Sequence, residues 1–161
     1  MASNPVYKVK RVVSIAGFNR VSEEYQVLAP QLQSKILLFL TKIYLWVRLG
    51  KAGNMPASET LKNSPCRVLY VQGDEDKTVP LSVGRLSLQK DLPGAKNIAF
   101  VNVPKRGHQC FLSMESEEYI IEMLRNKLTS PQGPVGLTMD LEKAGEENVE
   151  LMKTIFDFLA I

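Results

Sequence analysis

The most informative stretch of the chain is one in which an unbroken apolar run ends in a tight polar turn. It reads Val68-Leu69-Tyr70-Val71-Gln72-Gly73-Asp74-Glu75-Asp76-Lys77-Thr78-Val79-Pro80. A short continuous apolar run bounded by turn residues is typical of a parallel strand that is buried on both faces. The stretch therefore predicts such a strand over 67–72, with carboxylates just beyond its C-terminal end.

The segments on either side of this strand alternate between strand and helix patterns. Further strands are expected over 9–16 and 97–103, and helices over 34–49, 57–62, 81–90, 115–128 and 140–159. Parallel strands need long crossover connections, and helices usually supply them. The order predicts an α/β protein with one domain over 1–161, a three-stranded parallel sheet, flanking helices and a helical insertion after the first strand.

The helix expected over 34–49 is apolar on nearly every side, so we expect it to be covered all round. It is interrupted by Lys42 and Arg48 and is shorter than the roughly 20 residues that cross a bilayer. The sequence therefore predicts no membrane span.

Composition excludes several classes of function. Twenty basic and seventeen acidic residues give a net charge of only +3, which predicts no nucleic-acid surface. Two cysteines and one histidine make neither a disulfide framework nor a zinc set, and we expect no metal. Glycine-rich phosphate loops are missing, so no cofactor is expected. Because the two cysteines make no disulfide framework, a reducing cytoplasm is the default expectation.

Two residues are candidates for chemistry. Asp76 follows the end of its strand, at the edge where parallel sheets collect catalytic groups, and His108 follows the next strand through a glycine. A rigidly held carboxylate can orient a neighbouring histidine, and the imidazole of that histidine can then act as a general base. The alternatives are that Asp76 is a turn residue and His108 a surface residue. Cys110 as a thiol nucleophile is disfavoured, because neither His108 nor Cys110 brings an oxyanion hole.

These motifs together resemble the α/β-hydrolase superfamily, most closely bacterial esterases, lipases and serine peptidases. Residues 10–18 resemble the strand after the nucleophile elbow, 19–65 a helical cap or lid, 73–80 the acid turn and 107–108 the histidine loop. The final helix is similar to the one that closes that fold. The resemblance implies that Asp76 is the acid and His108 the base of a Ser-Asp-His triad.

The nucleophile of such a triad is missing from the sequence. No serine, cysteine or threonine lies in a G-x-S-x-G elbow, and in the family the serine and the oxyanion-hole loop precede the position where this chain begins. The resemblance therefore implies the C-terminal part of a serine hydrolase, with a small ester or amide substrate when it is joined to the missing N-terminal half. The 161 residues alone are expected to be inactive.

The alternative is a non-catalytic binding or interaction protein derived from the same fold. In either case the strand over 9–16 would lack a partner on one side, which leaves an open row of backbone donors and acceptors. We therefore expect self-association through this sheet edge, or packing against a missing half.

Overall fold

The structure is a computed structural model that describes residues 9–28, 35–129 and 139–160. The chain divides between His108 and Gln109 into two compact units, residues 1–108 and 109–161. The candidate residues Asp76 and His108 both belong to the first unit.

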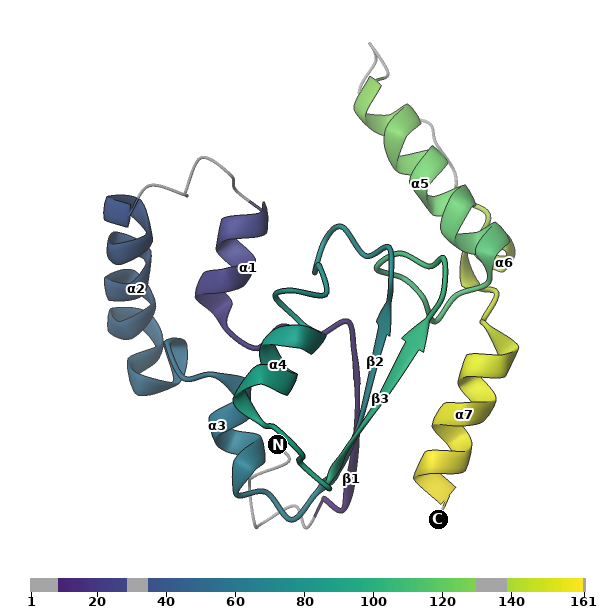
Figure 1. Cartoon of the computed structure of the whole chain (residues 1–161). Coiled ribbons are helices and arrows are strands. Elements are labelled where there is room, and N and C mark those ends of the chain that lie inside the picture. The colour runs from purple at the N-terminus through teal and green to yellow at the C-terminus, as the bar shows by residue number, and fades with distance from the viewer. Residues whose placement is uncertain (1–8, 29–34, 130–138, 161) are drawn as a thin grey trace. The chain divides into compact units, whose positions relative to one another are not determined.

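A three-stranded parallel sheet forms the centre of the first unit, as predicted (Figure 1). Its strands are β1 (Arg11–Ile15), β2 (Arg67–Gly73) and β3 (Ile98–Val103), in the order β1-β2-β3. Both pairs are parallel, and Gly73 lies opposite Val103. The C-terminal ends of β2 and β3 therefore meet at one edge of the sheet, and this brings the segments that follow them together.

Side chains on both faces of the central strand β2 are buried, which confirms the prediction drawn from its continuous apolar run. On one face, the core joins the sheet to α3 (Ala57–Lys62) and α4 (Arg85–Asp91). Its members are Val12, Leu61, Val68, Tyr70, Leu88, Leu92, Ala95, Ile98 and Phe100. Successive strand residues point to opposite faces, so Leu69 and Val71, also buried, belong to the other face.

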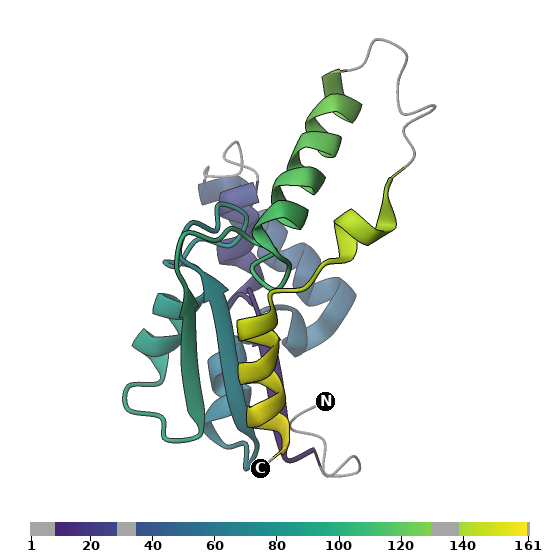
Figure 2. The same cartoon turned by 90° about the vertical axis from the view of Figure 1, so that its right-hand side faces the viewer.

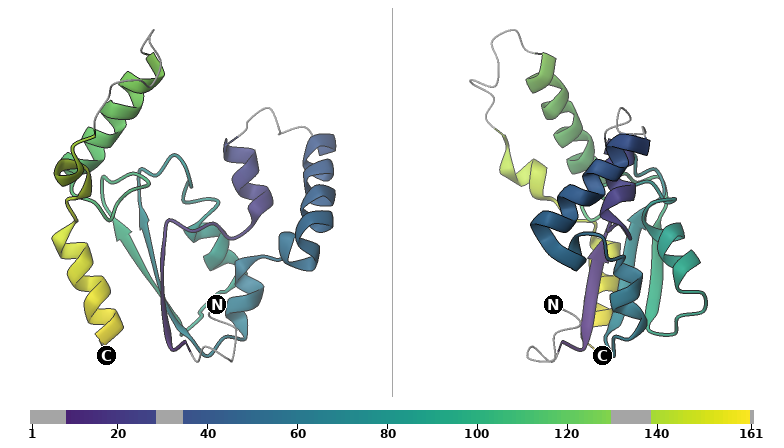
Figure 3. Two further views of the ribbon diagram at one scale, coloured as in Figure 1. Left: turned by 180° about the vertical axis from the view of Figure 1, so that it is seen from behind. Right: turned by 90° about the vertical axis from the view of Figure 1, so that its left-hand side faces the viewer.

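Between β1 and β2 the chain forms α1 (Val21–Leu28), α2 (Lys35–Leu49) and the 3₁₀ turn η3 (Gly50–Gly53) before it reaches α3. Helix α1 was not predicted, and residues 29–34 of the expected cap lie outside the described residues. Leu45 is the buried side chain of α2, and most of the others are exposed. Figure 3 shows α2 beside α1 and apart from the three strands. We expected α2 to be covered on all sides, but the described residues leave most of it exposed.

In the part of the chain that the structure describes, no helix is both long and apolar enough to cross a bilayer.

The second unit contains α5 (Met114–Thr129), α6 (Leu141–Gly145) and α7 (Val149–Ala160) (Figure 2). The sequence predicted one helix over 140–159, but the structure has two. Asp140 caps α6 by accepting hydrogen bonds from two backbone N–H groups. Asn148 starts α7 because its Oδ1 accepts from the backbone N–H of Leu151. A second side-chain cap within the segment therefore divides the expected helix.

Helix α4 also begins later than predicted, at Arg85 rather than Leu81. Residues 81–84 form turns, and Gly84 supplies no side chain to cap the helix. The Oε1 atom of Gln72 accepts a hydrogen bond from the backbone N–H of Arg85 at 3.0 Å. A buried side chain from β2 thus satisfies the first helical N–H group and fixes where the helix starts.

Candidate active site

Asp76 lies in the turn after β2, with its side chain completely buried. Its Oδ1 atom accepts hydrogen bonds from the backbone N–H groups of Thr78 at 2.9 Å and Val79 at 2.8 Å. This is the local bonding by which aspartate favours tight turns. One carboxylate oxygen is therefore held by the turn itself, and the direction of the other, Oδ2, is fixed.

His108 meets that second oxygen. The Nδ1 atom of His108 lies 3.0 Å from Oδ2 of Asp76, which is within hydrogen-bond distance. The His108 side chain is 43% exposed, whereas that of Asp76 is fully buried. The structure therefore brings together the two residues that the sequence singled out, and it leaves the imidazole accessible to solvent.

A close backbone approach holds the two segments together. The backbone N–H of Asp74 donates to the carbonyl oxygen of Val103, and that of Glu75 donates to the carbonyl oxygen of Arg106. A Cβ atom at Gly73 would lie 2.2 Å from the Arg106 oxygen and 2.3 Å from the Gly107 oxygen. Only glycine, which has no side chain, allows the loop before His108 to pack this closely on the end of β2.

Gln72 stabilises the turn that contains Asp76, and the sequence did not predict this role. It is fully buried, and its Nε2 donates to the carbonyl oxygen of Val79 at 2.5 Å. Its Oε1 accepts from the backbone of Arg85 and lies 3.2 Å from the hydroxyl of Tyr70, which donates to the Gly17 carbonyl oxygen. One signal was available: a polar residue that ends a continuous apolar run needs buried partners.

This geometry defines what the pair can do chemically. A carboxylate only accepts hydrogen bonds, so the neutral imidazole of His108 donates from Nδ1 and keeps its lone pair on Nε2. In that tautomer Nε2 can take a proton from a hydroxyl, and the buried carboxylate stabilises the resulting imidazolium.

Asp74 and Cys110, which lie close to the pair in the sequence, are less well placed. The Asp74 side chain is exposed, and Asp76 is the carboxylate that contacts His108. Cys110 is completely buried, which does not suit a nucleophile that must meet a substrate. Cys66 and Cys110 form no disulfide. Within residues 9–28, 35–129 and 139–160, no three residues are grouped as metal ligands.

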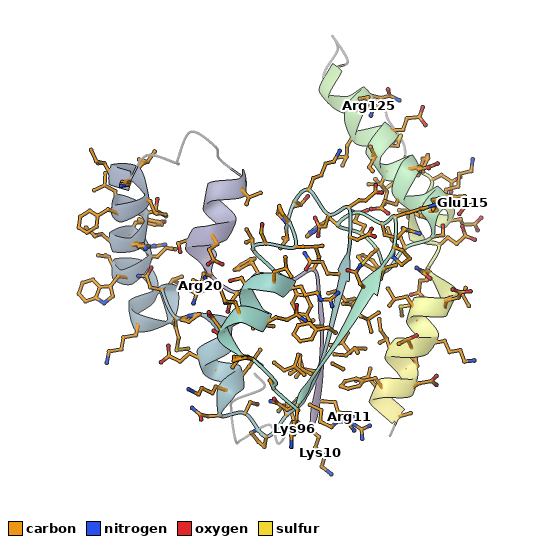
Figure 4. The ribbon with its side chains drawn as sticks, viewed as in Figure 1. Lys10, Arg11, Arg20, Lys96, Glu115 and Arg125 are labelled. Atoms are coloured by element: carbon orange, nitrogen blue, oxygen red, sulfur yellow. The ribbon has the colours of Figure 1, made fainter. Side chains whose placement is uncertain are left out.

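A second polar cluster joins the end of β1 to α3 and α4. Asn19 donates to Asp91 at 2.9 Å and to Ser87 at 3.1 Å, and the Ser58 hydroxyl donates to Asp91 at 2.9 Å. Arg20, at the base of α1, forms an ion pair with Asp91 (Figure 4). These groups bond to one another across three segments, so the cluster holds the end of β1, α3 and α4 together.

Asp91 carries the electrostatic consequence of this cluster. The hydrogen bond from Asn19 is the largest cause that lowers the pKa of Asp91 below its ordinary value. The Ser58 hydrogen bond and the charge of Arg20 act in the same direction, while burial opposes them. The cluster therefore stabilises the ionised form of Asp91.

The first unit also contains a mostly apolar cavity of about 300 Å³ on the sheet face beneath α3. Its walls include Val12, Phe18, Leu61, Val68 and Tyr70. Neither Asp76 nor His108 lines it. The cavity therefore does not present a ligand directly to the acid and histidine pair.

Comparison with known proteins does not identify the chain. No protein-family model matches it, and no curated protein matches it either. The assignment of function therefore depends on the geometry of Asp76 and His108 and on the sequence resemblance.

Proposed function

We propose that this chain is the C-terminal part of a serine hydrolase of the α/β-hydrolase type, which acts on ester or amide bonds. Asp76 is the acid that orients His108, and His108 is the general base. The observation that carries the proposal is the 3.0 Å contact between Nδ1 of His108 and the buried Oδ2 of Asp76, at the C-terminal edge of a parallel sheet. This is the edge at which such sheets place catalytic groups.

The proposal assigns the nucleophile to a segment outside the 161 residues, because no G-x-S-x-G element is present in them. His108 would take the proton of that serine through Nε2 while the carbonyl carbon of the substrate is attacked. It would then return the proton to the leaving group. Residues 19–65 are proposed as the cap over that site.

The first test uses the fact that His108 is the only histidine in the chain. Nitrogen-15 NMR of the imidazole should show the neutral tautomer with the proton on Nδ1. In Asp76→Asn the new amide presents its NH₂ group to Nδ1, so the proton should move to Nε2. Asp74→Asn is the matched control, because Asp74 is exposed and two residues away, and it should leave the tautomer unchanged. An unchanged tautomer in Asp76→Asn would contradict the role of Asp76.

The second test concerns activity. The coding sequence upstream of Met1 is translated in frame, and the extended chain is assayed for ester hydrolysis and for labelling by a fluorophosphonate. We expect labelling at an upstream serine, and a loss of turnover of about 10⁴-fold in Asp76→Asn. Ester hydrolysis that survived both Asp76→Asn and His108→Ala would overturn the assignment.

The alternative is a non-catalytic binding protein that kept half of the fold, and the exposed side chains of α2 favour it. A stop codon close upstream of Met1, with no G-x-S-x-G element encoded nearby, would support this alternative. Self-association through β1 stays a prediction of both readings. Among the described strands β1 pairs with β2 alone, and sedimentation at high concentration would detect the dimer.

A further inference from the structure

The exposed surface of α2 is separate from the acid and histidine pair and is large. Helical positions advance by about 100° per residue, so one side of α2 carries only apolar or aromatic residues over about 180° of its circumference. We call this side the apolar face of α2. Its members are Ile36, Leu37, Phe39, Leu40, Ile43, Tyr44, Trp46 and Val47. All eight are exposed, with Ile36 at 73% and Trp46 at 61%.

Charges flank this face in a particular way. At the same angular spacing, Lys35 and Lys42 border it along one edge and Arg48 along the other, and all three are exposed. The buried Leu45 lies on the opposite side of the helix. The helix therefore turns one side to the protein and presents the apolar face, edged by cations, to its surroundings.

The charge of this segment differs from that of the rest of the chain. Residues 25–58 contain four basic residues, Lys35, Lys42, Arg48 and Lys51, and no acidic residue. The chain has twenty basic and seventeen acidic residues in all. Outside residues 25–58 it therefore has sixteen basic and seventeen acidic residues. The positive net charge of the protein therefore lies in the segment that carries the apolar face of α2.

We propose that α2 lies in the surface of an anionic lipid bilayer. A helix of this kind buries its apolar side at the boundary between headgroups and acyl chains, while lysine and arginine along its edges reach anionic headgroups. Trp46 and Tyr44 suit the same depth, because their rings are amphipathic. All charged residues of 25–58 are basic, which an anionic bilayer complements along both edges of the face, and this favours lipid as the occupant.

The attachment is peripheral, since α2 is too short to span the bilayer. It requires neither Asp76 nor His108, so a failure of lipid binding and a failure of the hydrolase proposal are seen in different measurements. Each cation near an anionic surface is expected to strengthen binding about fivefold.

Trp46 is the only tryptophan of the chain and lies within the apolar face of α2, so it reports directly on insertion. The full chain is titrated with vesicles of phosphatidylcholine containing phosphatidylglycerol, and with vesicles of phosphatidylcholine alone. We expect a blue shift of tryptophan emission with the anionic vesicles only, reversed by high salt. Brominated lipids should quench the same emission.

Three variants sharpen the test. Lys42→Gln with Arg48→Gln should weaken binding about 25-fold, and Ile43→Ser with Val47→Ser should abolish the blue shift. Leu141→Ser removes an equally exposed apolar side chain from α6 and should bind normally. Circular dichroism and the His108 tautomer establish that each variant is folded.

Three results would overturn the proposal. The first is no blue shift with anionic vesicles, and the second is equal binding to phosphatidylcholine alone. The third is a dimer in sedimentation whose Trp46 emission is already blue without lipid, because the apolar face would then be covered by a second copy.

Discussion

The corner that holds Asp76 and His108 and the segment that forms α2 are built in opposite ways. Around Asp76, each contact supports another: the turn holds Oδ1, His108 meets Oδ2, Gln72 supports Val79, and Gly73 allows the loop to approach. In α2, eight apolar side chains on one side of the helix are exposed. Contacts within the chain therefore fix the structure around Asp76. The apolar face of α2 has no such contacts and needs a binding partner outside the described residues to bury it.

The largest expected effect comes from Gly73→Ala. Its new Cβ would overlap two backbone carbonyl oxygens that cannot rotate away, so the free energy of unfolding should fall by about 3 kcal/mol or more. Urea denaturation measures the loss, and NMR should show that the Nδ1 hydrogen bond of His108 is disrupted. Gly145→Ala is the control, because a Cβ there meets no atom within 4 Å. Equal stability of both variants would show that the corner is less tightly packed than described.

An intermediate effect is expected from Asp91→Asn, and it should depend on pH. The pKa of Asp91 is lowered in the folded state, so its stabilising effect is complete above the ordinary aspartate pKa of about 3.9 and is lost as the pH falls below it. The variant should be about 2 kcal/mol less stable at pH 7, and the difference should shrink towards pH 3.

The measurement for Asp91 is the free energy of unfolding of both proteins at several pH values between 3 and 7. Asp157→Asn, at an exposed position on α7, serves as the control and should show no such convergence. A difference in the free energy of unfolding between Asp91→Asn and the parent that stayed constant across this range would contradict the stabilising role of the ionised Asp91 carboxylate.

The smallest effect is expected from Trp46→Ser. Replacing a large aromatic residue usually costs several kcal/mol in a core, but Trp46 is 61% exposed. The free energy of unfolding in dilute solution should therefore change by no more than about 0.5 kcal/mol. Thermal denaturation tests this, and a clear loss would mean that the apolar face of α2 is covered in solution.

The sequence predicted the parallel sheet and the positions of Asp76 and His108 because those features depend on local patterns. A continuous apolar run marks β2, and the polar residues after β2 and β3 must meet once the two strands pair. Helix α1 was not predicted. The role of Gln72 was not predicted either, because its partners Val79 and Arg85 lie outside β2. The break before α7 depends on one capping residue, Asn148, inside an otherwise helical pattern.

The hydrogen bond between Asp76 and His108 joins residues 32 positions apart, and this separation affects the order of folding. The intervening segment contains α4 and β3, so we expect the contact to form after β3 has paired with β2. Closing such a loop costs chain entropy before any stabilising contact is gained. The Nδ1 proton of His108 should therefore report, during refolding, when β3 has paired with β2.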